Sequence, residues 1–273
     1  MPEGHFARAV AFEHRMQDAA AERVEPFAWG RAIFNDTYHR VYDLNALRVE
    51  RPDAAMTADG LAAEADRLHA PAGHLHRRVV VPDEAAGERL APGFRRLGWE
   101  VRRFLFMAQL REPDDATVRA EVRELDEAAH WEAKRWFMAA APEAFDDEVV
   151  TQLLEKDRLK ADIVDFRRYG VEAGGTVVSV CELYSDGATA QVEDVSTREG
   201  HRGRGYARAT VLTAVAAARA AGCELVFLVA DLDDWPKELY AKLGFDPIGL
   251  VYDFLRLPPG EKLPPKAEPR PAP

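Results

Sequence analysis

The chain has 273 residues, of which 47% are hydrophobic and 30% charged, the mixture of a folded globular protein and not of a disordered or collagen-like one. Lys and Arg number 36 against 47 Asp and Glu, so the formal net charge is −11. Phosphate backbones and anionic membranes repel such a chain at long range, which argues against nucleic acid or a membrane as its partner. Because the N-terminal residues lack an apolar signal core, we expect a cytoplasmic protein.

The cysteine and histidine pattern gives no sign of a metal site. The two cysteines, Cys181 and Cys223, both lie inside apolar runs that are typical of strands, where buried reduced thiols are expected. Neither a Cys-x-x-Cys nor a His-Glu-x-x-His spacing occurs, and the histidines are scattered. We therefore predict no metal.

The first half of the chain predicts a helix over His5–Glu22, a strand near Val41–Val49 and a strand over Val101–Leu110. A polar segment with a proline, residues 112–117, follows the last of these strands and marks a candidate domain boundary. The chain ends in residues 258–273, which contain seven prolines and lack apolar periodicity, so we expect a disordered tail there.

The second half alternates strand and helix patterns. Capping residues, glycine turns and apolar periodicity predict, in chain order, a strand at Thr117–Arg123, helices at Asp126–Phe137 and Asp146–Lys160, strands at Ala161–Tyr169, Thr176–Tyr184 and Thr189–Thr197, a helix at Ala207–Ala221, a strand at Leu225–Ala230, a helix at Pro236–Lys242 and a strand at Ile248–Arg256. Hairpins on one side and helical crossovers on the other indicate a mixed α/β or α+β sheet.

A short pattern occurs in both halves. In the first half, a strand ending at Val81 precedes a helix, a Leu-Gly-Trp turn at residues 97–99 and a further strand. In the second half, the same order surrounds the Leu-Gly-Phe turn at residues 243–245. The matching order on both flanks favours an internal duplication.

A loop rich in glycine and arginine, residues 200–209, lies between a predicted strand and a predicted helix. Its backbone N–H groups would point outward at a positive helix N-terminus, which is an anion-binding arrangement. A Rossmann fingerprint would need glycine at the position of Arg208, and a Walker loop would need lysine at the position of Tyr206. Both dinucleotide and P-loop interpretations therefore fail, and a solvated basic turn is the alternative.

The residues that do form a pattern are Arg202-Gly-Arg-Gly-Tyr-Ala207, followed by a long helix and then by Leu239-Tyr-Ala-Lys-Leu-Gly-Phe245. This ordered set resembles the GCN5-related N-acetyltransferase (GNAT) superfamily over about residues 117–257. The resemblance implies a mixed, mostly antiparallel GNAT sheet flanked by helices, present twice in tandem.

The resemblance also implies an acetyl-coenzyme A co-substrate. Its pyrophosphate is expected against Arg202, Gly203, Arg204, Gly205, Tyr206, Ala207 and Arg208. The glycines permit close approach to the backbone. The pantetheine arm is expected to pair like an added strand with Val195, Ser196 and Thr197.

Catalytic roles follow from the same resemblance. The family's usual acid maps onto Tyr240, although this tyrosine could instead simply pack against Phe245. For the base we favour Glu193, acting through water; Asp194 is the other candidate, and strand alternation predicts that the two carboxylates face opposite sides. Both carboxylates could also be structural, with the amine arriving neutral.

The sequence thus predicts three parts: a degenerate GNAT-like unit without the coenzyme loop over residues 1–111, a catalytic unit over 112–257, and the tail. The first unit would act as scaffold or as one wall of the acceptor site. Acidic residues at Glu143, Asp146 and Asp147 would suit a cationic acceptor or form a solvated helix face.

The leading interpretation is an acyltransferase that moves acetyl from acetyl-CoA to a primary amine of a small molecule, as a monomer or homodimer. A protein N-terminal or lysine acetyltransferase, which would need an open groove, is the first alternative. A non-catalytic acyl-CoA sensor or interaction module is the second.

Overall fold

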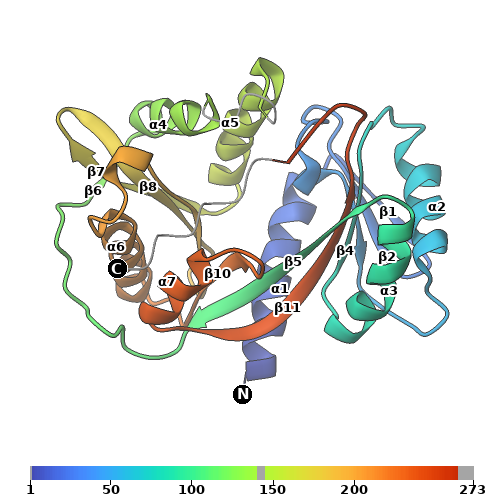
Figure 1. Ribbon diagram of the computed structural model, residues 1–273, viewed down its shortest axis with the longest axis horizontal. Helices are drawn as coiled ribbons and strands as arrows, with labels where there is room; N and C mark the ends of the chain where they lie inside the picture. Colours follow the sequence, from blue (N-terminus) through green and yellow to red (C-terminus); the bar gives the residue numbers. More distant parts are fainter. Residues whose placement is uncertain (1, 140–144, 264–273) are drawn as a thin grey trace.

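The computed structural model describes residues 2–139 and 145–263 (Figure 1). The described strands are β1 Arg23–Phe27, β2 Gly30–Phe34, β3 Ala46–Val49, β4 Arg77–Val81, β5 Glu100–Gln109, β6 Arg123–Glu124, β7 Asp165–Ala173, β8 Thr176–Ser185, β9 Thr189–Thr197, β10 Leu225–Asp231 and β11 Phe245–Arg256. The described helices are α1 Pro2–Ala20, α2 Ala58–His69, α3 Glu84–Arg96, α4 Glu127–Ala139, α5 Asp147–Ala161, α6 Tyr206–Ala220 and α7 Pro236–Lys242, with 3-10 turns η1 Tyr42–Leu44 and η2 Glu199–His201.

The strands form one sheet in the order β1-β2-β3-β4-β11-β5-β10-β9-β8-β7-β6. Two neighbouring pairs, β3–β4 and β9–β10, are parallel, and the remaining pairs are antiparallel. Parallel neighbours need a crossover connection, and α2 and α6 provide these two. The prediction of a mixed, mostly antiparallel sheet flanked by helices is confirmed.

The last strand of each half lies in the other half's part of the sheet. β5, which follows α3, lies between β11 and β10, while β11 pairs with β4. β5 and β11 pair with each other from Glu100↔Leu255 to Gln109↔Phe245. The predicted boundary between residues 111 and 112 falls in the connection from β5 to β6. The two predicted units share one sheet, and their division into separate domains stays a prediction.

Helix α1 covers the face of the sheet where the two halves meet (Figure 1). Phe12 packs edge-on against Phe227 of β10, and Phe6 packs edge-on against Phe106 of β5, with ring centroids 5.8 and 5.5 Å apart. Gly249 of β11 lies directly under Phe6, where a Cβ would come within 2.3 Å of the ring. α2 and α3 cover the opposite face in the first half, and α6 and α7 cover it in the second.

Most predicted elements are present within three residues at each end, and three predictions need correction. The predicted strand at Thr117–Arg123 is wrong, because only Arg123 and Glu124 pair with β7. β7 begins at Asp165 and not at Ala161, because α5 continues to that residue. A 3-10 turn, η1, replaces the first part of the predicted strand near Val41–Val49.

The start of the predicted disordered tail makes defined contacts. Glu261 accepts hydrogen bonds from Tyr42 and, at 3.0 Å, from Arg40. Residues 264–273 lie outside the described part of the chain. In the described ranges, no helix is long and apolar enough to span a membrane.

Candidate active site

A bulge separates strand β9 from its neighbour β10. The two strands pair only from Thr189 to Val192 of β9 within the described structure, although β10 itself continues to Asp231. Just beyond, Asp194 has φ +50°, and the register against β8 shifts. Because a bulge bends the strand that carries it, the backbone of residues 195–197 diverges from β10. This is the position at which the sequence predicts the pantetheine arm.

The glycine-rich loop leads from this bulged strand into α6. Gly203 and Gly205 have φ of +77° and +80°, a conformation that glycine adopts without steric cost. Gly205 is the N-cap of α6, and in the described structure no side chain caps this helix. The first N–H groups of α6 are thus available to an anionic ligand.

The two arginines of the loop hold its backbone. Arg202 donates to the carbonyl of Thr197 at 3.3 Å, and Arg204 donates to the carbonyl of Gly200 at 3.2 Å. Residues 202–205 are exposed. The structure therefore brings the predicted cofactor residues of the loop and of β9 together at one end of the sheet, and their role stays a prediction.

Asp115 lies next to this loop and was not predicted from the sequence. Arg208, in the first turn of α6, lies 3.2 Å from the carboxylate of Asp115, which belongs to the connection between β5 and β6. Hydrogen bonds from Thr117 and Arg208 hold the pKa of Asp115 below its usual value. A carboxylate therefore neutralises one cation of the predicted phosphate site in the structure as it stands.

Tyr240 and Glu193 approach the bulge from opposite faces of the sheet. Tyr240 of α7 is buried in the cluster that contains Val192, on the α6 side. Alternation along β9 places the next residue, Glu193, on the other side, where it lines a cavity. Burial, and then the charge of Glu193, raises the pKa of Tyr240.

The expectation that Glu193 and Asp194 face opposite sides is wrong. Both line the same cavity, because the positive φ of Asp194 interrupts the alternation of side chains at the bulge. The two carboxylates are not equivalent, however. Burial, together with the charge of Asp194, raises the pKa of Glu193 to about 8. Asp194 is exposed and forms an ion pair with Lys134 at 2.7 Å.

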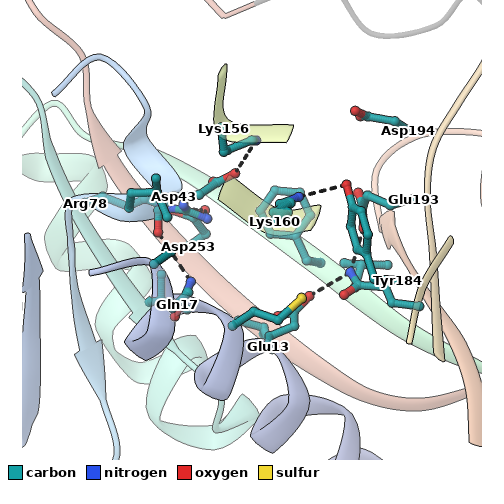
Figure 2. Close-up of a pocket in the computed structure, with 18 of the residues that line it drawn as sticks. Glu13, Gln17, Asp43, Arg78, Lys156, Lys160, Tyr184, Glu193, Asp194 and Asp253 are labelled. Carbon is teal, nitrogen blue, oxygen red and sulfur yellow. Dashed lines mark hydrogen bonds and ion pairs between the residues drawn. The ribbon is translucent and has the colours of Figure 1, made fainter. Parts of the chain in front are cut away.

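The cavity has a volume of about 260 Å³ and lies between α1, α5 and the sheet (Figure 2). Both halves contribute polar side chains to its lining. Glu13, Gln17, Asp43 and Arg78 come from the first half, and Lys156, Lys160, Tyr184, Gln191, Glu193, Asp194 and Asp253 from the second. A wall built by the first half is thus present beside the candidate base.

Glu13 is a site residue that the sequence did not reveal. The side-chain amide of Gln191 donates to Glu193 at 2.6 Å and to Glu13 of α1 at 3.0 Å. Burial raises the pKa of Glu13 to about 7. The charge of Glu13 in turn raises the pKa of Glu193. Helix periodicity gives Glu13 no distinguishing signal, since its partners lie far along the chain.

A buried lysine occupies the middle of an acidic cluster next to the bulge. His130, Asp157 and Glu182 place atoms of metal-ligand type within 4.8 Å of one another. The ammonium of Lys134 lies among them, 2.6 Å from Glu182 and 2.9 Å from Asp157. Although burial alone would lower it, the neighbouring carboxylates, Asp194 first, raise the pKa of Lys134. The lysine thus supplies the positive charge that a metal ion would bring.

Two of the acidic residues that suggested a cationic acceptor, Asp146 and Asp147, do not line the cavity. Asp146 is the N-cap of α5 and accepts from the backbone N–H of Val149 at 2.9 Å and from Arg40 at 3.1 Å. Asp147 is exposed in the first turn of the same helix. Glu143 lies outside the described residues.

Comparison with known proteins gives one match to a family model, over part of the chain. A family model described as the acetyltransferase (GNAT) family matches residues 126–245. A functionally unknown conserved protein from Staphylococcus epidermidis ATCC 12228 superposes with a TM-score of 0.66 at 15% identity, over 86% of this chain and 94% of that one. No match is found among curated proteins.

Two further solved structures are similar in fold. A GCN5-related N-acetyltransferase from Kribbella flavida gives a TM-score of 0.58 at 17% identity, over 92% of this chain and 94% of that one. A tandem GNAT protein from the clavulanic acid biosynthesis pathway gives 0.51 at 15% identity, over 72% of this chain and 69% of that one. At such identities the likeness is one of fold.

Proposed function

Because residues 126–245 match the model of the acetyltransferase (GNAT) family, we propose that this protein transfers an acetyl group from acetyl-CoA to a primary amine of a small molecule. The observation that carries the proposal is the position of Glu193. It lies beside the bulge of β9 and lines a cavity walled by α1, α5 and the sheet. A compact cavity of about 260 Å³ favours a small acceptor over a protein segment, which would need an open groove.

The residues fit the binding of the co-substrate. The open first turn of α6 and the left-handed Gly203 and Gly205 would hold the pyrophosphate, since a glycine permits the close approach that a Cβ would block. The diverging backbone of residues 195–197 would hold the pantetheine arm as an added strand. When bound, acetyl-CoA would supply the acetyl group as a thioester.

Proton movements can be assigned to two side chains. An amine attacks a carbonyl carbon only when it is neutral, so Glu193 would take the proton that the amine loses as the C–N bond forms. A carboxyl group with a pKa near 8 is a stronger base than an ordinary glutamate. Tyr240, on the other face of the sheet, would donate a proton to the departing sulfur as the C–S bond breaks.

The test has two stages. Calorimetry with wild-type protein should show binding of acetyl-CoA, and a screen of small amines should then show release of free thiol. Tyr240→Phe should lower kcat while the Kd for acetyl-CoA stays unchanged. Failure of the wild type to bind acetyl-CoA would contradict the proposal, and binding without turnover across a broad panel would favour a sensor.

A further inference from the structure

Two lysines of α5 point into the cavity one helical turn apart (Figure 2). Lys160 donates to the hydroxyl of Tyr184 at 2.8 Å, and its ammonium lies 4.1 Å from the centre of the same ring. Within the described residues, no carboxylate oxygen lies within 4.0 Å of this ammonium. Lys160 is thus a largely enclosed cation without a direct counter-ion.

Two acidic side chains of the second half near Lys160 are already engaged by another cation. Glu182 and Asp157 both accept hydrogen bonds from Lys134, at 2.6 and 2.9 Å. Glu182 also accepts from the hydroxyl of Tyr184. Their charges reach Lys160 only at longer range.

The acidic side chains that the first half and β11 contribute are engaged as well. Arg78 is paired with Asp43 and, at 2.8 Å, with Asp253. Lys156 lies 3.7 Å from Asp43, which is beyond hydrogen-bond range. Although burial alone would lower it, the charge of Asp43 raises the pKa of Lys156, so this lysine has a counter-ion, which it shares with Arg78.

Asp194, which also lines the cavity, is paired with Lys134, and the two remaining carboxyl groups, Glu13 and Glu193, do not contact Lys160. Glu13 and Glu193 share the amide of Gln191, and their raised pKa values, about 7 and about 8, keep them partly protonated near neutral pH. Burial, followed by the charge of Lys156, lowers the pKa of Lys160. A buried cation that lacks a partner is costly, and an anion in the cavity would remove that cost.

We propose that the acceptor is a primary amine that also carries an anionic group, either a carboxylate or a phosphate, which binds between Lys156 and Lys160. The proposal rests on the proposed acetyl transfer, because it assigns the acceptor of the same site. In Figure 2, Lys160 lies between Lys156 and Glu193, so the anionic end would face the lysines and the amino end the candidate base. The acidic residues near the start of α5 suggested a cationic acceptor, and the lysines suggest an acceptor with an anionic group in its place.

The experiment compares matched acceptors. Amino acids are set against their carboxamides, which keep the shape and lose the charge, and against aminoalkyl phosphates. Wild-type kcat/KM should favour the anionic member of each pair by at least about tenfold, as expected for one buried ion pair. Whichever of the carboxylate and phosphate series gives the higher kcat/KM identifies the anion.

Variants at the lysines give the second readout. Lys160→Met and, separately, Lys156→Met should reduce the preference toward unity, whereas Lys242→Met, an exposed lysine of α7, should keep it. Because Lys160→Met removes a buried unpaired charge, its Tm without ligands should equal or exceed that of the wild type. Calorimetry of amino acid binding without acetyl-CoA should show the same loss in both cavity variants.

Failure of this inference can be told apart from failure of the proposed function. If the wild type binds acetyl-CoA and acetylates neutral carboxamides or diamines as well as their anionic partners, the assignment of an anionic acceptor is overturned while acetyl transfer stands. Loss of acetyl-CoA binding by the wild type would instead overturn acetyl transfer itself. A preference that survives in both cavity variants would also contradict the role of the lysines.

Discussion

The two parallel strand pairs of the sheet reach their crossover helices through different junctions. At the start of α2, the side chain of Thr57 accepts a hydrogen bond from the backbone N–H of Gly60 at 3.1 Å. At the start of α6, the corresponding cap is Gly205, which has no side chain to offer. One helix satisfies its own first turn, and the other leaves that turn open to an anion.

The loops before these helices are both exposed, and arginine side chains donate to backbone carbonyls in each. In the first half, Asp53 accepts from the indole of Trp29 at 2.9 Å, and Arg89 donates to the carbonyls of Asp53 and Met56. In the second half, Arg202 and Arg204 donate to the carbonyls of Thr197 and Gly200. The two junctions therefore differ in the cap of the helix, Thr57 against Gly205, and not in the exposure of the loop.

The strands differ too. β3 pairs with β4 through Leu47↔Val79 and Arg48↔Val80, while β9 carries the bulge at Asp194. The side chain of Asp194 is held by Lys134 of α4, which also binds Asp157 of α5 and Glu182 of β8. Lys134 thus connects the bulge of β9 to α4, on which it lies, and to α5 and β8.

The largest effect is expected from removing that lysine. Lys134→Met leaves Glu182 and Asp157 buried without their cation, so the free energy of unfolding should fall by about 3–5 kcal/mol. Guanidinium unfolding measures this change. Lys242→Met, an exposed lysine, should stay within about 0.5 kcal/mol of the wild type. If the stability of the Lys134 variant is unchanged, the ion pairs of Lys134 do not stabilise the acidic cluster and the bulge.

The next effect concerns the open helix start. Gly205→Glu places a negative charge and a side chain at the predicted phosphate site, and acetyl-CoA binding should weaken by about 100-fold or more, worth about 2.7 kcal/mol. Calorimetry measures the Kd. Gly73→Glu is the matched control, because Gly73 has the same φ of +80° and, like Gly205, open space around it, but lies in the first half. Equal losses in both variants would mean that backbone strain, and not ligand contact, is responsible.

Local sequence patterns were sufficient to predict the helix that follows the glycine loop and the strand that carries Glu193. The loop that contains Gly205 could be predicted because its glycines and arginines lie within residues 200–209, between a predicted strand and a predicted helix. The bulge at Asp194 could not, since the residues that hold it, Lys134 and Asp157, lie on helices far away in the sequence.

The exchange of β5 and β11 between the two halves of the sheet could not be predicted from the sequence either. Both strands read correctly as strands, but their neighbours depend on which surfaces pack together, and the pattern within each strand is satisfied by either partner. For the same reason the sequence placed the base on β9 and missed Glu13, which reaches it from α1.

A smaller effect is expected at the closed junction. Thr57→Ala removes the cap of α2 and should lower the free energy of unfolding by about 1 kcal/mol. The Kd for acetyl-CoA should stay at the wild-type value, because the first junction is not expected to bind it. Paired unfolding and calorimetry experiments test both statements. Weakened acetyl-CoA binding in this variant would show that the two junctions are coupled through the sheet.

The smallest effect tests what the first half contributes to the chemistry. The pKa of Glu193 is raised to about 8, and a base works in its deprotonated form, so kcat/KM should rise with pH through that value and then level off. In Glu13→Gln one nearby negative charge is absent, which removes a cause of the raised pKa, so the midpoint should move to lower pH by a fraction of a unit. Glu88→Gln, an exposed glutamate of the same half, should leave the profile in place. A midpoint that stays or rises in the Glu13 variant would mean that the first half encloses the cavity without tuning its base.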